Sequence, residues 1–381
     1  MILARDYVTH GIRQRASELL TLELGPEDEF EQQLKLAREV EADRFTRLDR
    51  SILKHVDQSY LTVSSLPPQE PQAHTAHVRR LKHLSDMGLA VERQTGVWEI
   101  VSDMERKLRS LGQRNDIIAT MHRAMRQAGI DRPAGNFAIF HAEVAPKPIM
   151  GQVAALGLTD EITDRHYIVI DGTDGRVHYA DIGRVRPEAL PEKGMVVSVE
   201  ASKHQDDERL LTRLRIQSYL TFEKLAEAEG VTWLDRELVA TLPVHMANQG
   251  FGAEAEIALN QRRQWLIAQG LGQLDSEGAF QAKPKLFETL RQREYQHATH
   301  VLSKELGLSH HAPIEGEQIS GTFTKSVKLA SGKYAIIQKA QEFTLVPWRP
   351  DMEPMRGKNI TGTTTAQGIQ WEWGPRRGLG I

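Results

Sequence analysis

The feature that most constrains the fold of this 381-residue chain is an apparent internal repeat. The segment MGLAVERQTGVW (Met87 to Trp98) aligns with QGLGQLDSEGAF (Gln269 to Phe280). Gly-Leu stands second in both, and a glycine precedes the closing aromatic residue by two positions. Self-similarity of this kind indicates that one structural unit is used twice. Duplication is the first interpretation, and a chance match between two helix-hairpin segments is the alternative.

The residues around the first copy predict a winged-helix unit. Val78, Leu81, Leu84 and Met87 form an apolar stripe at helical spacing. Gly88 stands where a helix commonly ends in a left-handed glycine. LAVERQTGVWEIV then reads as two short strands joined at Thr95-Gly96. A helix that is closed by glycine and followed by a hairpin is typical of the end of a winged helix.

Each copy is followed by a segment rich in short strands. The first contains GQVAALGL, RHYIVIDG, GRVHYADI and GMVVSVEA, and the second contains ISGTFTKSV, GKYAIIQK, EFTLVPW and NITGTTT. Gly151 corresponds loosely to Gly321, and YIVI from Tyr167 corresponds to YAII from Tyr334. β-branched and aromatic residues between glycine-rich turns favour strands. We therefore expect two small antiparallel β-barrels.

Together these patterns predict an α+β protein in which two winged-helix units alternate with two small antiparallel β-barrels. The expected segments are a helical segment (1–63), a linker (64–73), a winged helix (74–144), a β-barrel (145–215), a second helical or winged-helix unit (216–312) and a C-terminal β-barrel (313–381).

Composition excludes several classes of protein. There are no cysteines, which rules out disulfides, thiolate metal sites and a cysteine nucleophile. No apolar run approaches the ~18 residues of a membrane span, and the start lacks the pattern of a secretory signal. We expect a cytoplasmic protein without a membrane partner.

Charge is distributed unevenly along the chain. The net charge is −3, yet residues 74–130 carry ten Lys/Arg against six Asp/Glu, and residues 313–381 carry nine against six. Residues 1–60 carry nine against twelve. A local basic excess favours nucleic-acid binding even when the whole chain is near neutral. A solvated surface of mixed charge is the alternative.

The residues predicted to contact DNA lie in the two helix-hairpin units and the tail. They are Arg79, Arg80, Lys82 and His83 on the proposed recognition helix, Arg93 in the wing, Arg262 and Arg263 in the second copy, and Arg376 and Arg377 in the C-terminal GPRRGLGI. Trp348, Trp371 and Trp373 lie near this tail. They could stack on bases, but the alternation in IQWEW favours burial of Trp371 and Trp373.

No residue is predicted to be catalytic, and no metal or cofactor is expected. Tyr7 lacks an evident base or metal ligand that would make it a nucleophile. Three groups have metal-ligating types, namely Glu294 with His297 and His300, His74 with His77, and His310 with His311; surface histidines are the favoured interpretation. The acidic run Asp160, Glu161, Asp164, Asp171 and Asp174 surrounds turn glycines, where aspartate bonds the backbone.

Several long stretches resemble one family. They are LARDYVTHGIRQRASELLTLELGP, EVEADRFTRLDRSIL, GLTDEITDRHYIVIDGTDGRVHYADIG and the ending LVPWRP…WEWGPRRGLGI. The chain resembles the relaxase/mobilization nucleases of plasmids and integrative elements, of the type related to the T-DNA border endonuclease, in their C-terminal domain of unknown function. The resemblance implies an upstream nicking domain with a nucleophilic tyrosine and a metal-binding histidine cluster. The chain starts just after that point, and it contains no His-hydrophobic-His pair.

We therefore expect a non-catalytic C-terminal region of a conjugative relaxase, which binds or positions origin-of-transfer DNA and is not an enzyme on its own. The alternative is a protein–protein adaptor that docks the relaxase to relaxosome or secretion-system proteins without touching DNA. Salt-dependent DNA affinity separates the two.

Overall fold

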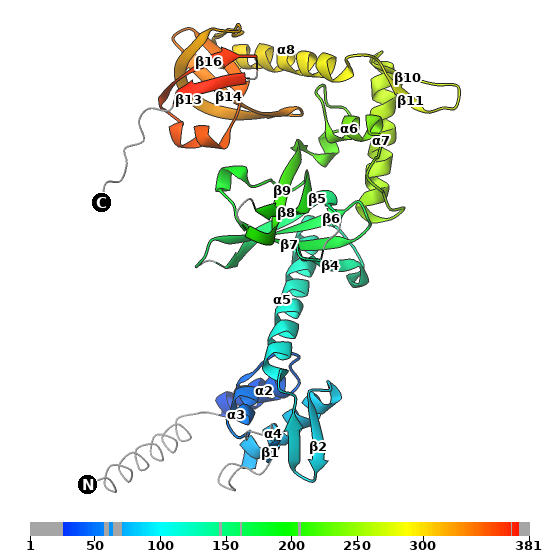
Figure 1. Cartoon of the computed structure of the whole chain (residues 1–381), viewed down its shortest axis with the longest axis vertical. Coiled ribbons are helices and arrows are strands. Elements are labelled where there is room, and N and C mark those ends of the chain that lie inside the picture. The colour runs from blue at the N-terminus through cyan, green and yellow to red at the C-terminus, as the bar shows by residue number, and fades with distance from the viewer. Residues whose placement is uncertain are drawn as a thin grey trace, which may run out of the picture. The chain divides into compact units, whose positions relative to one another are not determined.

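Helical segments alternate with mostly antiparallel sheets along the chain, so the predicted α+β class is confirmed (Figure 1). The computed structural model describes residues 26–56, 61–63, 71–144, 147–160, 162–204, 207–366 and 368–372. The chain divides into two compact units, Met1–Ala119 and Thr120–Ile381. The boundary between them falls inside the long helix α5 (Met104–Ala128). Among the described residues, no helix combines the length and apolarity that a membrane crossing requires.

In its described residues, the first unit combines three helices and the start of α5 with a small sheet. The helices are α2 (Pro26–Val40), α3 (Arg47–Leu53) and α4 (Pro71–Asp86). The strands β1 (Leu61–Val63), β2 (Ala90–Gln94) and β3 (Val97–Ile100) pair in the order β1-β3-β2. Because α4 begins at Pro71, the last residues of the predicted linker are helical.

Helix α4 ends as its sequence predicts. Gly88 has φ +70°, the left-handed conformation that glycine adopts without steric cost. The N–H of Leu89 donates to the carbonyl of Leu84 at 2.8 Å, and the N–H of Gly88 donates to that of Ser85 at 2.9 Å. These bonds satisfy carbonyls that the end of the helix leaves free. The chain then turns directly into the β2–β3 hairpin, which confirms the predicted hairpin around Thr95-Gly96.

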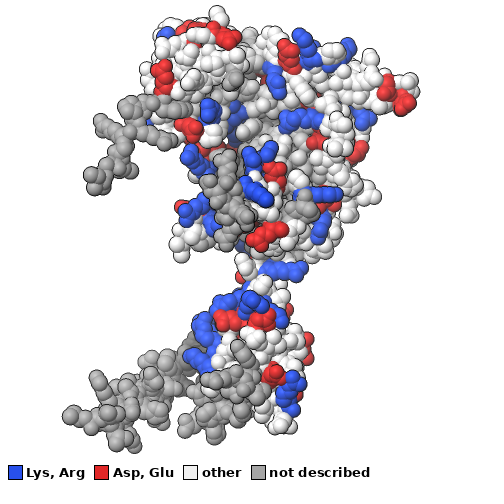
Figure 2. All heavy atoms as spheres, viewed as in Figure 1, with Lys and Arg blue, Asp and Glu red and all other residues white. Residues whose placement is uncertain are grey.

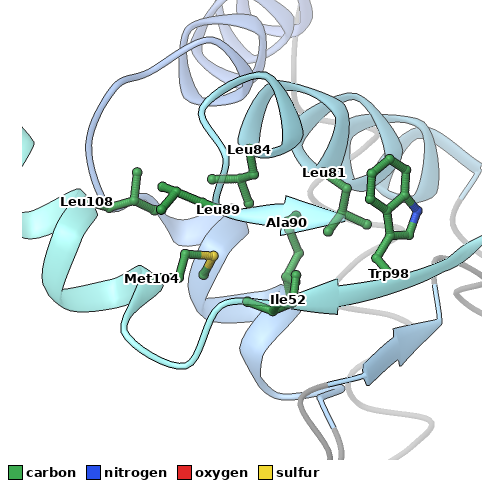
Figure 3. Packing of buried hydrophobic residues seen from close by; sticks show 9 residues of the cluster. Ile52, Leu81, Leu84, Leu89, Ala90, Trp98, Met104 and Leu108 are labelled. Atoms are coloured by element: carbon green, nitrogen blue, oxygen red, sulfur yellow. The ribbon is translucent and has the colours of Figure 1, made fainter. Parts of the chain in front are cut away.

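The apolar stripe of α4 forms the core of this unit. Figure 3 shows Leu81 and Leu84 of α4 packed with residues from the hairpin and from α5. Trp98 is 3% exposed, and Leu84 and Leu108 are fully buried. Burying side chains of this size stabilises the unit by about 1.5–3 kcal/mol each. The full cluster is Ile52, Leu81, Leu84, Leu89, Ala90, Trp98, Ile100, Met104 and Leu108.

The second unit begins with a six-stranded sheet. Its strands are β4 (Phe137–Phe140), β5 (Ile149–Asp160), β6 (Arg165–Gly172), β7 (Val177–Arg184), β8 (Met195–His204) and β9 (Asp207–Thr221), in the order β4-β7-β6-β5-β8-β9.

A second helical segment and a second six-stranded sheet follow. The helical segment contains α6 (Trp233–Val239), α7 (Gly250–Ala268), the hairpin β10 (Gly272–Leu274) and β11 (Phe280–Ala282), and α8 (Leu286–Leu306). The sheet contains β12 (Ser309–His310), β13 (Gln318–Leu329), β14 (Gly332–Lys339), β15 (Glu342–Pro347), β16 (Asn359–Thr365) and β17 (Gly368–Glu372), in the order β12-β15-β14-β13-β16-β17.

The predicted closed barrels are wrong. In each six-stranded sheet the two edge strands, β4 and β9 or β12 and β17, pair only with their inner neighbours over the described residues. A closed barrel requires its first and last strands to pair with each other. Both sheets therefore stay open, and the strand-rich pattern predicted strands without determining closure.

The two sheets have the same topology, which supports the predicted duplication. Each begins with a short strand that pairs in parallel with its fourth strand, and the other pairings are antiparallel. A Cβ atom at Gly151 would lie 2.1 Å from the carbonyl oxygen of Asp171, and one at Gly321 would lie 2.5 Å from that of Gln338. Asp171 and Gln338 hold equivalent positions after the aligned YIVI and YAII. The same close backbone contact thus requires glycine in both copies.

Candidate nucleic-acid interface

The predicted recognition helix α4 carries a buried arginine that anchors it to α3. The guanidinium of Arg80 donates from Nε to Asp49 Oδ1 at 2.8 Å and from Nη2 to Asp49 Oδ2 at 2.9 Å. It also donates to the backbone carbonyls of Val40, Ala42 and Arg44 at 3.0, 2.6 and 2.9 Å. An arginine has five N–H donors, and these five bonds use all of them.

Asp49 is itself held in place by the start of α3. Its carboxylate accepts from the backbone N–H and the hydroxyl of Thr46 at 2.7 and 2.8 Å, in a capping box that opens the helix. The side chains of Arg80 and Asp49 are both 0% exposed. A buried charge is tolerated only when it is paired and hydrogen-bonded, and both conditions are met here. We call Arg80, Asp49 and Thr46 the first arginine node.

The second copy contains the same node. Arg262 on α7 donates to both carboxylate oxygens of Asp235 at 2.7 and 2.9 Å, and Thr232 caps α6 through Asp235. The remaining donors of Arg262 reach the carbonyls of Ala226, Ala228 and Gly230 at 3.3, 2.5 and 2.9 Å. In both nodes the three carbonyls lie nine, seven and five residues before the aspartate. This coincidence is the strongest structural support for duplication.

Two predicted DNA contacts are therefore corrected. Arg80 and Arg262 are fully buried and have no donor left for a phosphate. The prediction failed because the helical pattern identifies an arginine as polar but does not show whether a buried carboxylate pairs with it in the fold. A signal was present in the sequence: Thr-x-Leu-Asp-Arg occurs twice, from Thr46 and from Thr232, at the start of each copy.

The other predicted residues of α4 remain available at the surface. Arg79 and Lys82 are exposed, and their spacing of three residues places them on one side of the helix. His83 is half-buried, with Nε2 3.1 Å from Asp43 Oδ1. Arg93 is exposed in the hairpin and forms an ion pair across it with Glu99. Two unburied cations on one helix face are thus the core of the candidate interface.

The node allows the two copies to be compared position by position. With Arg80 aligned to Arg262, Arg79 corresponds to Gln261 and Lys82 to Gln264. In the aligned hairpins, Arg93 corresponds to Asp275. The second helix therefore presents neutral amides where the first presents cations. Arg263 takes the place of the core residue Leu81 and is half-buried.

Charges elsewhere are interspersed rather than segregated. On the face shown in Figure 2, Lys and Arg lie among Asp and Glu in both units. Many exposed cations are paired with nearby acids, including Arg109 with Glu105 and Arg165 with Asp181. A mixed surface of this kind attracts DNA weakly. Any specific contact must come from local groups such as Arg79 and Lys82.

The two described C-terminal tryptophans, Trp348 and Trp371, make contacts within the fold. Trp371 is 7% exposed and packs in the core of the last sheet, which confirms its predicted burial. Trp348 donates from Nε1 to Glu353 at 2.9 Å, and Lys333 Nζ lies 3.5 Å from its ring centroid. Lys333 thus covers one face of the Trp348 ring, which also packs against the core of the last sheet. Trp373, Arg376 and Arg377 lie outside the described residues, as does Tyr7.

Several of the residues with metal-ligating side chains have other partners. Glu294 is buried and accepts from the backbone N–H groups of Ala330 and Ser331, so its carboxylate holds the β13–β14 turn. His297 pairs with Glu229 at 3.1 Å. Of the other two groups, His77 is buried, His310 contacts Tyr295, and His311 pairs with Glu317 at 2.7 Å. Within the described part of the chain, no three His, Cys, Asp or Glu side chains converge on one metal position.

The acidic run of the first sheet supplies two structural contacts. Arg132 Nη2 bridges Asp171 Oδ2 at 2.8 Å and Glu254 Oε1 at 2.7 Å, which ties the segment after α5 to β6 and α7. Burial raises the pKa of Asp171 above its ordinary value, although hydrogen bonds from Arg132 oppose this. Asp174 lies in the β6–β7 turn and accepts from the backbone N–H of Arg176 at 3.1 Å, as predicted for a turn aspartate.

His178 completes this turn. Its Nε2 lies 2.9 and 3.0 Å from the two carboxylate oxygens of Asp174, and its side chain is 8% exposed. Burial acts to raise the pKa of Asp174, but the hydrogen bond and charge of His178 together with the Arg176 N–H bring that pKa below its usual range. Asp174 is therefore a hydrogen-bond acceptor placed between His178 and the backbone N–H of Arg176.

The geometry thus defines an α+β protein with a duplicated order of elements and a cationic face on helix α4. In comparisons with known proteins, the family model described as "protein of unknown function (DUF3363)" matches residues 77–212 and 202–380. These matches cover more than half of the chain, which belongs to this family. No curated protein and no solved structure matches the chain.

Proposed function

We propose that the chain is a non-catalytic DNA-binding region of a plasmid-mobilization system, and that it contacts DNA through α4 and the β2–β3 hairpin of the first unit. The observation that carries this proposal is the pair of exposed cations, Arg79 and Lys82, on a helix whose neighbouring Arg80 is fixed inside the fold. Because the helix is anchored, its backbone does not have to become ordered when its outer side chains bind.

The arrangement of the first unit supports a winged-helix mode of contact. Helices α3 and α4 precede a hairpin, and β1 completes a three-stranded sheet with it. In helix-turn-helix proteins, the second helix enters the major groove while basic residues grip phosphates. Here α4 would be the recognition helix, with Arg93 at the wing. The resemblance to relaxases supports origin-of-transfer DNA as the target.

Fluorescence anisotropy with labelled duplex and single-stranded DNA tests the proposal. We expect binding that weakens with salt, because phosphate contacts release counterions. Replacing both Arg79 and Lys82 with alanine removes two such contacts. It should therefore reduce the slope of log K against log salt by about 1.8 on duplex DNA, at about 0.9 per phosphate contact.

The matched control removes the same charge from α5 through Arg106→Ala with Arg114→Ala. This pair should leave the salt slope within about 0.5 of the parent value. If the two double variants had equal effects, binding would depend on diffuse electrostatic attraction and not on the helix face of α4. Absence of binding at low salt would overturn the DNA proposal and favour the adaptor that docks relaxosome or secretion-system proteins.

A further inference from the structure

A cavity in the second unit has no role in the DNA interface described above. It has a volume of about 820 Å³ and lies against the edge strand β4, the β6–β7 turn, residues 147–150 and the loop before α7. Ligand sites commonly enclose about 300–1,000 Å³ and combine apolar walls with a few polar groups. The volume is therefore suited to a small organic ligand.

The polar side of this cavity is cationic. Lys147 and Arg176 line it together with three histidines, His141, His178 and His245. Asp174 is the one carboxylate among the described lining residues. It contacts His178 and the backbone N–H of Arg176, and its single charge is outnumbered by the two exposed cations Lys147 and Arg176. An anionic group is the ligand that such a surface favours.

The second copy shows that the fold does not require these residues. In the first sheet Val169 pairs with Tyr179 across two strands, and in the second sheet Ile336 pairs with Leu345 in the equivalent place. Arg176 therefore corresponds to Glu342, and His178 corresponds to Thr344. The second sheet forms the same strands in the same order without either side chain. The second copy forms its sheet without this side-chain cluster. The cluster in the first copy therefore has a role other than sheet formation.

The cavity also has apolar lining residues. Ile139 and Phe140 of β4, Met150 of β5 and Val244 are among them. We propose that this cavity binds a nucleotide, with the phosphate toward Arg176 and Lys147 and the base against these apolar residues. The nucleotide is either a free mononucleotide or the phosphorylated end of a single strand. This proposal stands apart from DNA binding by α4.

Calorimetric titration of the full chain tests the proposal with three probes. They are thymidine 5′-monophosphate, a short oligothymidylate with a 5′-phosphate and the same oligomer with a 5′-hydroxyl. Arg176→Glu should weaken binding of a phosphate-bearing probe by at least about tenfold, since a charge-assisted hydrogen bond is lost and repulsion is added. The variant suits the fold because Arg176 is exposed and the second copy has glutamate there.

Arg213→Glu is the matched control, since Arg213 is exposed on β9 and does not line the cavity. It should leave affinity within about twofold. Binding of the mononucleotide identifies a free ligand, whereas binding of the 5′-phosphorylated oligomer alone identifies a strand end. The proposal is overturned if no probe binds saturably, or if Arg176→Glu and Arg213→Glu behave alike. Arg79→Ala with Lys82→Ala should not alter mononucleotide binding, which separates this test from that of the DNA interface.

Discussion

At the scale of single residues, the position of an arginine decides whether it holds the fold or meets a ligand. Arg79 and Arg80 are neighbours in the sequence, yet one is exposed and the other is 0% exposed. Arg80 bonds a carboxylate of α3 and three carbonyls from the end of α2 and the loop after it, all more than thirty residues earlier. Only the folded chain brings those acceptors together. The sequence pattern could not show them, and it therefore predicted DNA contacts for both Arg79 and Arg80.

Replacing Arg80 with methionine should destabilise the first unit strongly. The change leaves the buried Asp49 without its cation and leaves three carbonyls without donors, for which we expect a loss of about 3–5 kcal/mol. Arg79→Met is the control and should change the free energy of unfolding by less than about 0.5 kcal/mol. Urea unfolding of both variants measures the difference. Similar values for the two would mean that the node does not stabilise the unit.

A second residue, Tyr295, should make stability depend on alkaline pH. Burial raises the pKa of its hydroxyl from 10.0 to about 12. The hydroxyl donates to the carbonyl of Leu345 at 3.1 Å and lies 3.1 Å from His310 Nε2. Since the folded-state pKa is raised, its stabilising contribution is complete below pH 10 and is lost as the pH rises toward 12.

Two measurements check this prediction. In ultraviolet difference titration, the native protein should show a tyrosine signal near pH 12 that is missing from Tyr295→Phe. Unfolding midpoints of the parent should fall more steeply between pH 10 and 12 than those of the variant. Superimposable titration curves would contradict the assignment.

At the scale of elements, the copied helices α4 and α7 share an anchor and differ in their outer residues. Both are fixed to the preceding short helix by an arginine node. Arg79 and Lys82 in one correspond to Gln261 and Gln264 in the other. Because the backbone framework is the same, the difference in charge is the property that distinguishes the two surfaces.

A charge graft tests this distinction. In the Arg79→Ala, Lys82→Ala background, Gln261→Arg with Gln264→Lys should restore part of the salt-dependent affinity for duplex DNA and raise the salt slope by about 1–2. Anisotropy at two salt concentrations measures it. The control graft, Gln273→Arg with Ser276→Lys in the second hairpin, adds equal charge away from the helix. If both grafts raise the slope equally, added charge alone is responsible.

At the scale of the whole molecule, the duplicated order of elements was largely predictable. The helix that ends at Gly88, its hairpin and the matching segment from Gln269 follow from local patterns of apolar residues and glycine. The correspondence of Gly151 and Gly321 in the repeat was also predicted correctly. Each lies beside a strand whose backbone carbonyl leaves no room for a Cβ atom. These features depend on neighbours along the chain or on the adjacent strand.

The sequence by itself determined the α+β class, the repeat, the hairpins and the burial of Trp371, because short-range periodicity and turn residues encode them. Tertiary structure alone decided that both sheets stay open, that Arg80 and Arg262 are internal anchors, and that Arg176 and His178 share a cavity. The physical reason is that strand closure, charge pairing and cavities depend on groups distant in sequence, whose meeting no local pattern records.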